Sequence, residues 1–249
     1  MSPRPRAQLP DEAFERNGHA KVDATTPRNR TAGTIRELID LVVSRDVDDE
    51  ILATAAGDLE AVLDRLHAAA APGKRVRGHP DPSHHPQDYF PNSPLAGATN
   101  PLSLPLDMWG VSNPGGLDFI RGRAVFSLAY EGPPTCVHGG MIALLFDEIL
   151  GNANIVAGRP GMTGTLTIRY RRPTPLLVPL ELEARQIRVE GRKIMTTGTI
   201  TVAGEITAEA EAIFIEVPPS QMLGIAGYNA QRAGGDVVDP ELRRAIEAD

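Results

Sequence analysis

A glycine pair followed by an apolar segment constrains the fold of this chain more than any other feature. Proline and glycine punctuate the sequence up to Gly140, whereas Met141 to Leu150 contains neither and is almost wholly apolar. This pattern predicts a helix that is buried on most of its surface. One carboxylate stands out, because Asp147 follows Gly140 by seven residues. On a helix that spacing is two turns, roughly 10 Å along one face.

The two ends of that face could carry an oxyanion-binding site and a buried acid or base. The amides of Gly139 and Gly140 have no side chains to obstruct approach and a helix N-terminus behind them, so they can point N–H groups at a developing negative charge. Asp147 would supply an acid or a base. Each feature also has a purely structural interpretation, in which Asp147 is bonded to a neighbouring hydroxyl and the glycines make a tight helix entry. Glu148, about 100° around the helix, is the competing candidate base.

The segments around the helix alternate polar and apolar residues, which is typical of half-buried strands. Five strands are expected, at 120–130, 162–172, 178–190, 194–202 and 206–214. A change of parity predicts a bulge near Arg185-Gln186. One long helix between the first strand and the others predicts an α+β fold in which an antiparallel sheet wraps around that helix. Uncovered sheet edges predict pairing with a second copy, as a homodimer or a dimer of dimers.

The sequence before the first strand divides into an arm, a helical hairpin and a connector. Residues 1–30 are rich in proline and charge and predict a flexible arm. Within 31–70, helical spacing predicts two amphipathic helices, the first capped by Thr34 and the second by Asp48 or Asp49. We expect this hairpin to pack against the sheet, because its apolar stripes cannot remain in water.

The connector completes the segment 31–116 and is dense in proline, glycine and histidine. His79, His84 and His85 raise the possibility of a metal site, but without an ordered ligand spacing a solvated loop is the better interpretation. After the sheet domain at 117–217, residues 218–249 predict a polar tail with one weak helix.

Composition narrows the class of protein. There are 32 acidic and 25 basic residues, a net charge of -7, which gives no general reason to expect a nucleic acid partner. The single cysteine, Cys136, excludes an internal disulfide framework and fits a reducing compartment. It lies two residues before His138, but no orienting partner supports a Cys-His nucleophile, so a buried small residue is expected. With no signal-like start and no expected membrane span, the prediction is a cytoplasmic protein.

The ordered motifs resemble a known family. A strand leads into His138-Gly139-Gly140, a helix carries Asp147, and the strand Met162-Thr163-Gly164-Thr165-Leu166-Thr167-Ile168-Arg169-Tyr170-Arg171-Arg172-Pro173 precedes a meander. Over roughly 117–217 this order resembles the hotdog-fold acyl-CoA thioesterases of the PaaI-like group, and most of all their thioesterase-superfamily-member branch.

The resemblance implies a role for each motif residue. Asp147 would act as general base on water, or as nucleophile, against the thioester carbonyl. The Gly140 amide would bind the thioester oxygen, and His138 would lie near it. Thr163, from the partner subunit, would orient the water or the carboxylate, although Thr165 and Thr167 are alternatives on the same strand. The site would lie at a dimer interface and would need no metal or other cofactor.

The sequence also suggests residues that bind the substrate, and it leaves alternative functions open. Candidate substrate-binding residues are Gly139, Glu148, Arg171 and Arg172, the two arginines for the phosphates of coenzyme A. The main prediction is hydrolysis of an acyl-CoA thioester. The alternatives are a non-catalytic hotdog protein that binds acyl-CoA or a lipid, and a hotdog dehydratase or hydratase. The acyl group cannot be inferred, because pocket depth depends on side chains from two chains.

Overall fold

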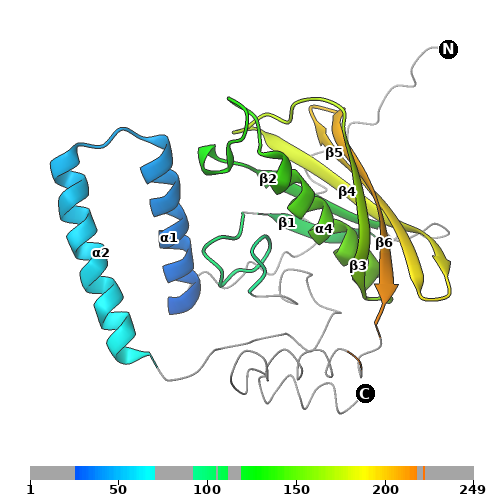
Figure 1. Ribbon diagram of the computed structural model, residues 1–249, viewed down its shortest axis with the longest axis horizontal. Helices are drawn as coiled ribbons and strands as arrows, with labels where there is room; N and C mark the ends of the chain where they lie inside the picture. The colour runs from blue at the N-terminus through cyan, green and yellow to red at the C-terminus, as the bar shows by residue number, and fades with distance from the viewer. Residues whose placement is uncertain (1–25, 71–91, 105, 112–118, 218–220, 222–249) are drawn as a thin grey trace.

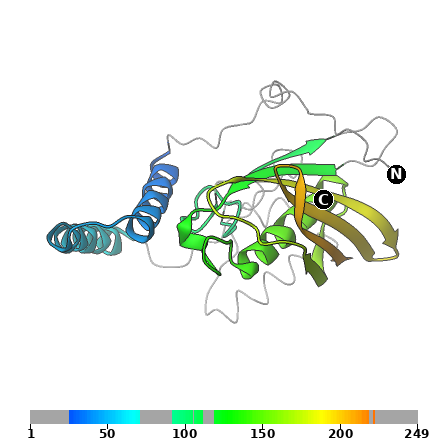
Figure 2. The ribbon, with the colours of Figure 1, turned by 90° about the horizontal axis from the view of Figure 1, so that it is seen from above.

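The computed structural model describes residues 26–70, 92–104, 106–111, 119–217 and 221. One antiparallel sheet of six strands dominates these residues, in the order β1-β2-β4-β5-β6-β3 (Figure 1). The strands are β1 (Asp107–Val111), β2 (Phe119–Val125), β3 (Gly161–Tyr170), β4 (Pro179–Glu190), β5 (Lys193–Val202) and β6 (Glu205–Glu216). Helix α4 (Gly139–Val156) lies against one face of the sheet (Figure 2). The expected α+β architecture, with a long helix inside an antiparallel sheet, is confirmed.

The core forms where α4 meets the sheet. On the helix, Phe146 and Leu150 are fully buried. On the strands, Ile120 and Ile200 are fully buried and Phe214 is nearly so. By length and composition α4 could also cross a membrane, contrary to our expectation that no segment would reach that length. Its packing is that of a core helix, because burial of such side chains against a sheet is what stabilises a domain.

The segment expected to be connector supplies part of this core. Leu95, Leu104 and Leu106 are buried, and β1 pairs with β2 so that Met108 faces Gly122. The sheet therefore begins ten residues before the boundary expected at 117. Conversely, the strand expected to run to Tyr130 ends at Val125, and the 3-10 helix η2 (Leu128–Tyr130) follows, where the Ser127 hydroxyl accepts from the Ala129 amide.

The two N-terminal helices behave differently. Helix α1 (Pro27–Ser44) begins inside the expected arm, because Thr26 rather than Thr34 caps it and Pro27 fits its first turn. It packs on η2 and buries Ala32. Helix α2 (Asp49–Ala69) is capped by Asp48 as expected, but it buries none of its residues. The expected docking of the hairpin therefore holds for α1 alone.

Several expectations fall outside the described residues. These are most of the arm, the three connector histidines, and the tail with its weak helix. Within the part of the chain that the structure describes, no group of three or more His, Cys, Asp or Glu side chains could hold a metal ion.

Candidate active site

The N-terminus of α4 is fixed on both sides by hydrogen bonds. His138 is the N-cap: its amide donates to the Tyr130 carbonyl at 2.9 Å, and its Nδ1 accepts from the Gly140 amide at 3.0 Å. Across the helix end, the Tyr170 hydroxyl donates to the Gly139 carbonyl at 2.9 Å. The amide expected to bind the thioester oxygen therefore already has a partner in its own chain.

The loop before the helix is a tight turn. The Gly132 amide donates to the Cys136 carbonyl, and a Cβ at Gly132 would lie only 2.7 Å from the His138 Cα, so no other residue fits there. Thr135 adopts a φ of 65° and its amide donates to a Glu131 carboxylate oxygen at 2.7 Å. Cys136 is half-buried in this turn. Since His138 Nδ1 is committed to Gly140, the turn offers no activated Cys-His pair through that nitrogen.

Asp147 pairs with a hydroxyl on the edge strand. The Thr163 hydroxyl donates to Asp147 Oδ1 at 2.6 Å, within one chain. We expected this hydroxyl to come from the partner subunit, whereas here it contacts the carboxylate of its own chain. Asp147 itself is only half-buried.

A bulge in β3 explains why Thr163 reaches the helix. The register of β3 against β6 shifts between Thr163 and Thr165, so Thr163 stands opposite Phe214 while Thr165 stands opposite Ile213. Paired residues point to the same face of a sheet, and Phe214 is a buried core residue. Thr163 therefore faces α4, whereas Thr165 faces away. Bulges commonly re-aim side chains in this way beside functional sites.

Glu148 is partly buried, like Asp147, but it faces another part of the chain. Ser93 donates its hydroxyl to Oε2 at 3.0 Å, and the Asn152 amide group donates to Oε1 at 3.4 Å. Burial raises the pKa of Glu148, the bonds from Ser93 and Asn152 lower it, and the charge of Asp147 raises it further; the net direction is upward. Glu148 thus ties the segment at Ser93 to the helix, and nothing in its geometry supports the expected contact with substrate.

The two candidate phosphate-binding arginines are already paired. Arg171 binds Glu209, and Arg172 binds Glu205, both on β6. The hydrogen bond from Arg171 is the largest cause of a lowered pKa of Glu209. Binding the phosphates of coenzyme A would require these pairs to open, so the described structure does not favour that role.

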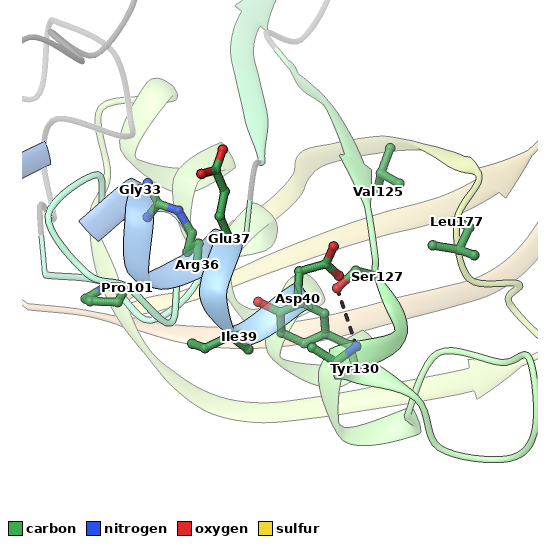
Figure 3. A pocket seen from close by; sticks show the side chains of 11 residues that line it. Gly33, Arg36, Glu37, Ile39, Asp40, Pro101, Val125, Ser127, Tyr130 and Leu177 are labelled. Carbon is green, nitrogen blue, oxygen red and sulfur yellow. Dashed lines mark hydrogen bonds between the residues drawn. The ribbon is translucent and has the colours of Figure 1, made fainter. Parts of the chain in front are cut away.

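A separate cleft of about 470 Å³ lies between α1 and η2 (Figure 3). Ile39 and Val125 line it together with Arg36, whose Nη1 donates to the Asn100 carbonyl and the Ser103 hydroxyl, both at 3.0 Å. Its lining includes neither Asp147 nor Thr163. Helix α1, and not α2, therefore shapes this cleft beside η2.

Sequence reasoning missed two residues that support the site. In the sequence Tyr170 only continues the alternation of its strand, and nothing there links it to Gly139, 31 residues away. Ser93 gave no signal, since its partner Glu148 is 55 residues away in the chain.

Comparison with known proteins now identifies the family. A family model described as "Thioesterase superfamily" matches residues 135–209. A crystal structure of a thioesterase superfamily protein matches with a TM-score of 0.67 and 32% identity, covering 77% of this chain and 96% of that one. The chain belongs to the thioesterase superfamily. Its sheet and central helix are those of the hotdog fold, as the sequence predicted.

Curated relatives of this thioesterase superfamily chain are acyl-coenzyme A thioesterases. The mouse protein THEM4 is 38% identical over 98 residues, which are 39% of this chain and 42% of the mouse protein. THEM4 of Xenopus laevis is 34% identical over 91 residues, 36% of this chain and 41% of the frog protein. The matched part thus spans about two fifths of the length of these relatives.

Proposed function

We propose that this chain hydrolyses an acyl-CoA thioester to the free acid and coenzyme A. Membership of the thioesterase superfamily supports thioester chemistry, and the names of the curated relatives support an acyl-CoA substrate. The observation that carries the proposal is the pair of Asp147 and Thr163, a half-exposed carboxylate held at 2.6 Å by a hydroxyl on β3, the edge strand of the described sheet. A protein that only binds its ligand has no need of such a pair.

In the proposed reaction Asp147 acts on water. Thr163 holds Oδ1, which leaves Oδ2 to accept a proton as the water oxygen forms a bond to the thioester carbonyl carbon. The carbon–sulfur bond then breaks, and the proton passes to the departing thiolate. Direct attack by the carboxylate, followed by hydrolysis of the anhydride, is the alternative route for the same residue.

The distance along α4 supports a site made from two chains. Gly140 and Asp147 are roughly 10 Å apart on one helix, whereas one carbonyl group needs its oxyanion donor and its attacking water within about 3 Å on either side. We therefore propose a homodimer in which the helix N-terminus of one chain meets Asp147 of the other. Pairing of the β3 edges would bring them together and would cover an edge that no other described strand pairs with.

Binding at the helix N-terminus would involve an exchange of partners. The thioester oxygen would replace His138 Nδ1 at the Gly140 amide, so that the imidazole turns away as substrate enters. The positive end of the helix dipole favours the charge that develops there. Gly139 lies at the same helix end.

Cytoplasmic location and a role in lipid metabolism stay predictions from the composition and the family resemblance.

Thiol release from a panel of acyl-CoA substrates tests the function. Asp147→Asn preserves volume and removes basicity, so it should lower kcat by roughly two to four orders of magnitude with little change in KM. Glu148→Gln is the matched control, because its side chain faces Ser93, and its effect on kcat should be mild. If no acyl-CoA releases thiol, or if the Asp147 variant retains full turnover, the proposed function is wrong.

A further inference from the structure

Helix α2 presents a long apolar face that no part of the described structure covers. It stands apart from the sheet in Figures 1 and 2, and none of its residues is buried. The large apolar side chains exposed on it are Ile51, Leu52, Leu59, Val62, Leu63 and Leu66. A contiguous group of large exposed apolar side chains marks an interaction surface in soluble proteins.

The spacing of this face is that of a helix–helix seam. Leu52, Leu59 and Leu66 recur every seven residues, and an apolar residue follows each of them after three. Those followers are Ala55, Val62 and Ala69. A sustained alternation of three and four is the pattern by which one helix packs along another. The face therefore fits a partner helix better than a sheet or a loop.

The charges on α2 argue against a lipid surface. Five carboxylates stand against one arginine within Asp49–Ala69. Helices that lie on membranes carry Lys and Arg on the polar face, because membrane surfaces are negative. An acidic helix with this seam is suited to another protein.

The residues at the seam are complementary to themselves when two copies run antiparallel. In that arrangement a leucine of one helix faces the three-residue follower on the other. With Leu59 opposite Val62 of the second copy, Leu52 stands opposite Ala69 and Leu66 opposite Ala55. Every layer then combines one leucine with a smaller residue. A parallel pairing would instead place leucine on leucine and, at two of the three follower layers, alanine on alanine, which leaves voids.

The same alignment pairs the charges that flank the seam. Asp58 and Arg65 each precede a seam leucine by one residue, and the antiparallel alignment brings Asp58 of each copy beside Arg65 of the other. Two opposite-charge pairs result, related by the two-fold axis. In a parallel alignment, position 58 of one copy lies beside Leu63 of the other, and these charges do not meet.

We propose that α2 pairs antiparallel with α2 of a second copy, about a two-fold axis that passes between Glu60 and Ala61. This contact is separate from pairing at β3, because α2 and β3 belong to different ends of the chain's architecture (Figure 1). It joins chains through the N-terminal hairpin, and together the two contacts yield an assembly larger than a dimer.

Cysteine cross-linking tests the alignment in the full-length chain. Ala55→Cys with Leu66→Cys, in a Cys136→Ser background, should give a covalent dimer on mild oxidation. These two positions on one helix are roughly 16 Å apart, too far for a bond within a chain. Ala55→Cys alone is the control and should not cross-link, because position 55 meets position 55 only in a parallel pair. Cross-linking of the single variant, or none by the double variant, overturns the proposal.

Charge exchange and a seam variant test the contact by sedimentation. Leu59→Asp should remove one step of association while the far-UV circular dichroism is retained. Asp58→Arg should raise the dissociation constant about tenfold, and adding Arg65→Asp should restore it to within about threefold. An assembly mass unchanged by Leu59→Asp shows that α2 has a different occupant or none, and the proposal is then wrong. Thiol release is measured on the same Leu59→Asp variant, so that a failure of the α2 contact can be told apart from a failure of the proposed function at Asp147.

Discussion

The Thr163 hydroxyl donates to Asp147 Oδ1 at 2.6 Å, so a side chain of the edge strand β3 holds a carboxylate of the central helix α4. The bulge before Thr165 makes this contact possible by turning Thr163 toward the helix. A carboxylate fixed through one oxygen has a defined direction for the other. Thr163 therefore orients the proposed base, and does more than give its carboxylate a hydrogen-bond donor.

Thr163→Val tests this positioning. Valine has the shape of threonine without the hydroxyl, so the carboxylate loses its donor while packing is nearly conserved. We expect kcat for thiol release to fall by about 10- to 100-fold, because misplacement of a catalytic group is costly. Thr163→Ser keeps a hydroxyl and should retain most of the activity. Equal activities of the Val and Ser variants would remove Thr163 from the mechanism.

His138 should contribute to stability as the cap of α4. His138→Ala leaves the Gly140 amide without its Nδ1 acceptor, and loss of an N-cap costs about 1 kcal/mol. His138→Asn supplies a capping oxygen and should unfold in urea close to the wild-type midpoint. An Asn variant as unstable as the Ala variant would contradict the capping role.

Glu148→Gln should change how stability depends on pH. The raised pKa of Glu148 means that the folded state holds this proton more tightly than the unfolded state. The associated stability is fully present below the ordinary pKa of 4.5 and is lost as pH rises through the higher folded value. A glutamine at this position cannot ionise and loses nothing over that interval. The free energy of unfolding of the variant minus that of the wild type should therefore grow with pH and then level off.

Denaturant unfolding at several pH values measures that difference. Glu60→Gln, which alters an exposed carboxylate on α2, is the control and should follow the wild-type profile. A constant difference between the Glu148 variant and wild type across pH would contradict the assignment.

The β3 edge should control both assembly and activity. Thr165→Asp with Thr167→Asp places two charges on β3, where like charges from two chains would approach each other. We expect a smaller mass in sedimentation and a loss of thiol release, because the proposed site needs both chains. Ile187→Asp, at an exposed position on the interior strand β4, is the control and should leave the mass unchanged. Full activity in a monomer would overturn the shared site.

The sequence predicted the helix and five of the six strands because their patterns are local. Strand β1 escaped prediction because only five residues carry it, inside a proline-rich segment. The start of α1 escaped because Pro27 reads as a helix breaker, although proline suits a first turn. In the site, periodicity identified Asp147, but the orientation of Thr163 depends on a bulge that strict alternation hides. The main hydroxyl partner of Glu148 is Ser93, 55 residues away in the sequence.

The strand order has a consequence for how the chain matures on the ribosome. Strand β3 leaves the ribosome before β4, β5 and β6, yet its only sheet neighbour among the described strands is β6. Until Glu216 has emerged, the nascent chain contains the apolar helix α4 and the strand β3, which still lacks its sheet neighbour β6. Exposed apolar surface and unpaired strands are the features that chaperones recognise in growing chains. Strand β6, the last strand in the described part of the chain, therefore completes the sheet, and stalling translation shortly before it should leave a chain sensitive to protease.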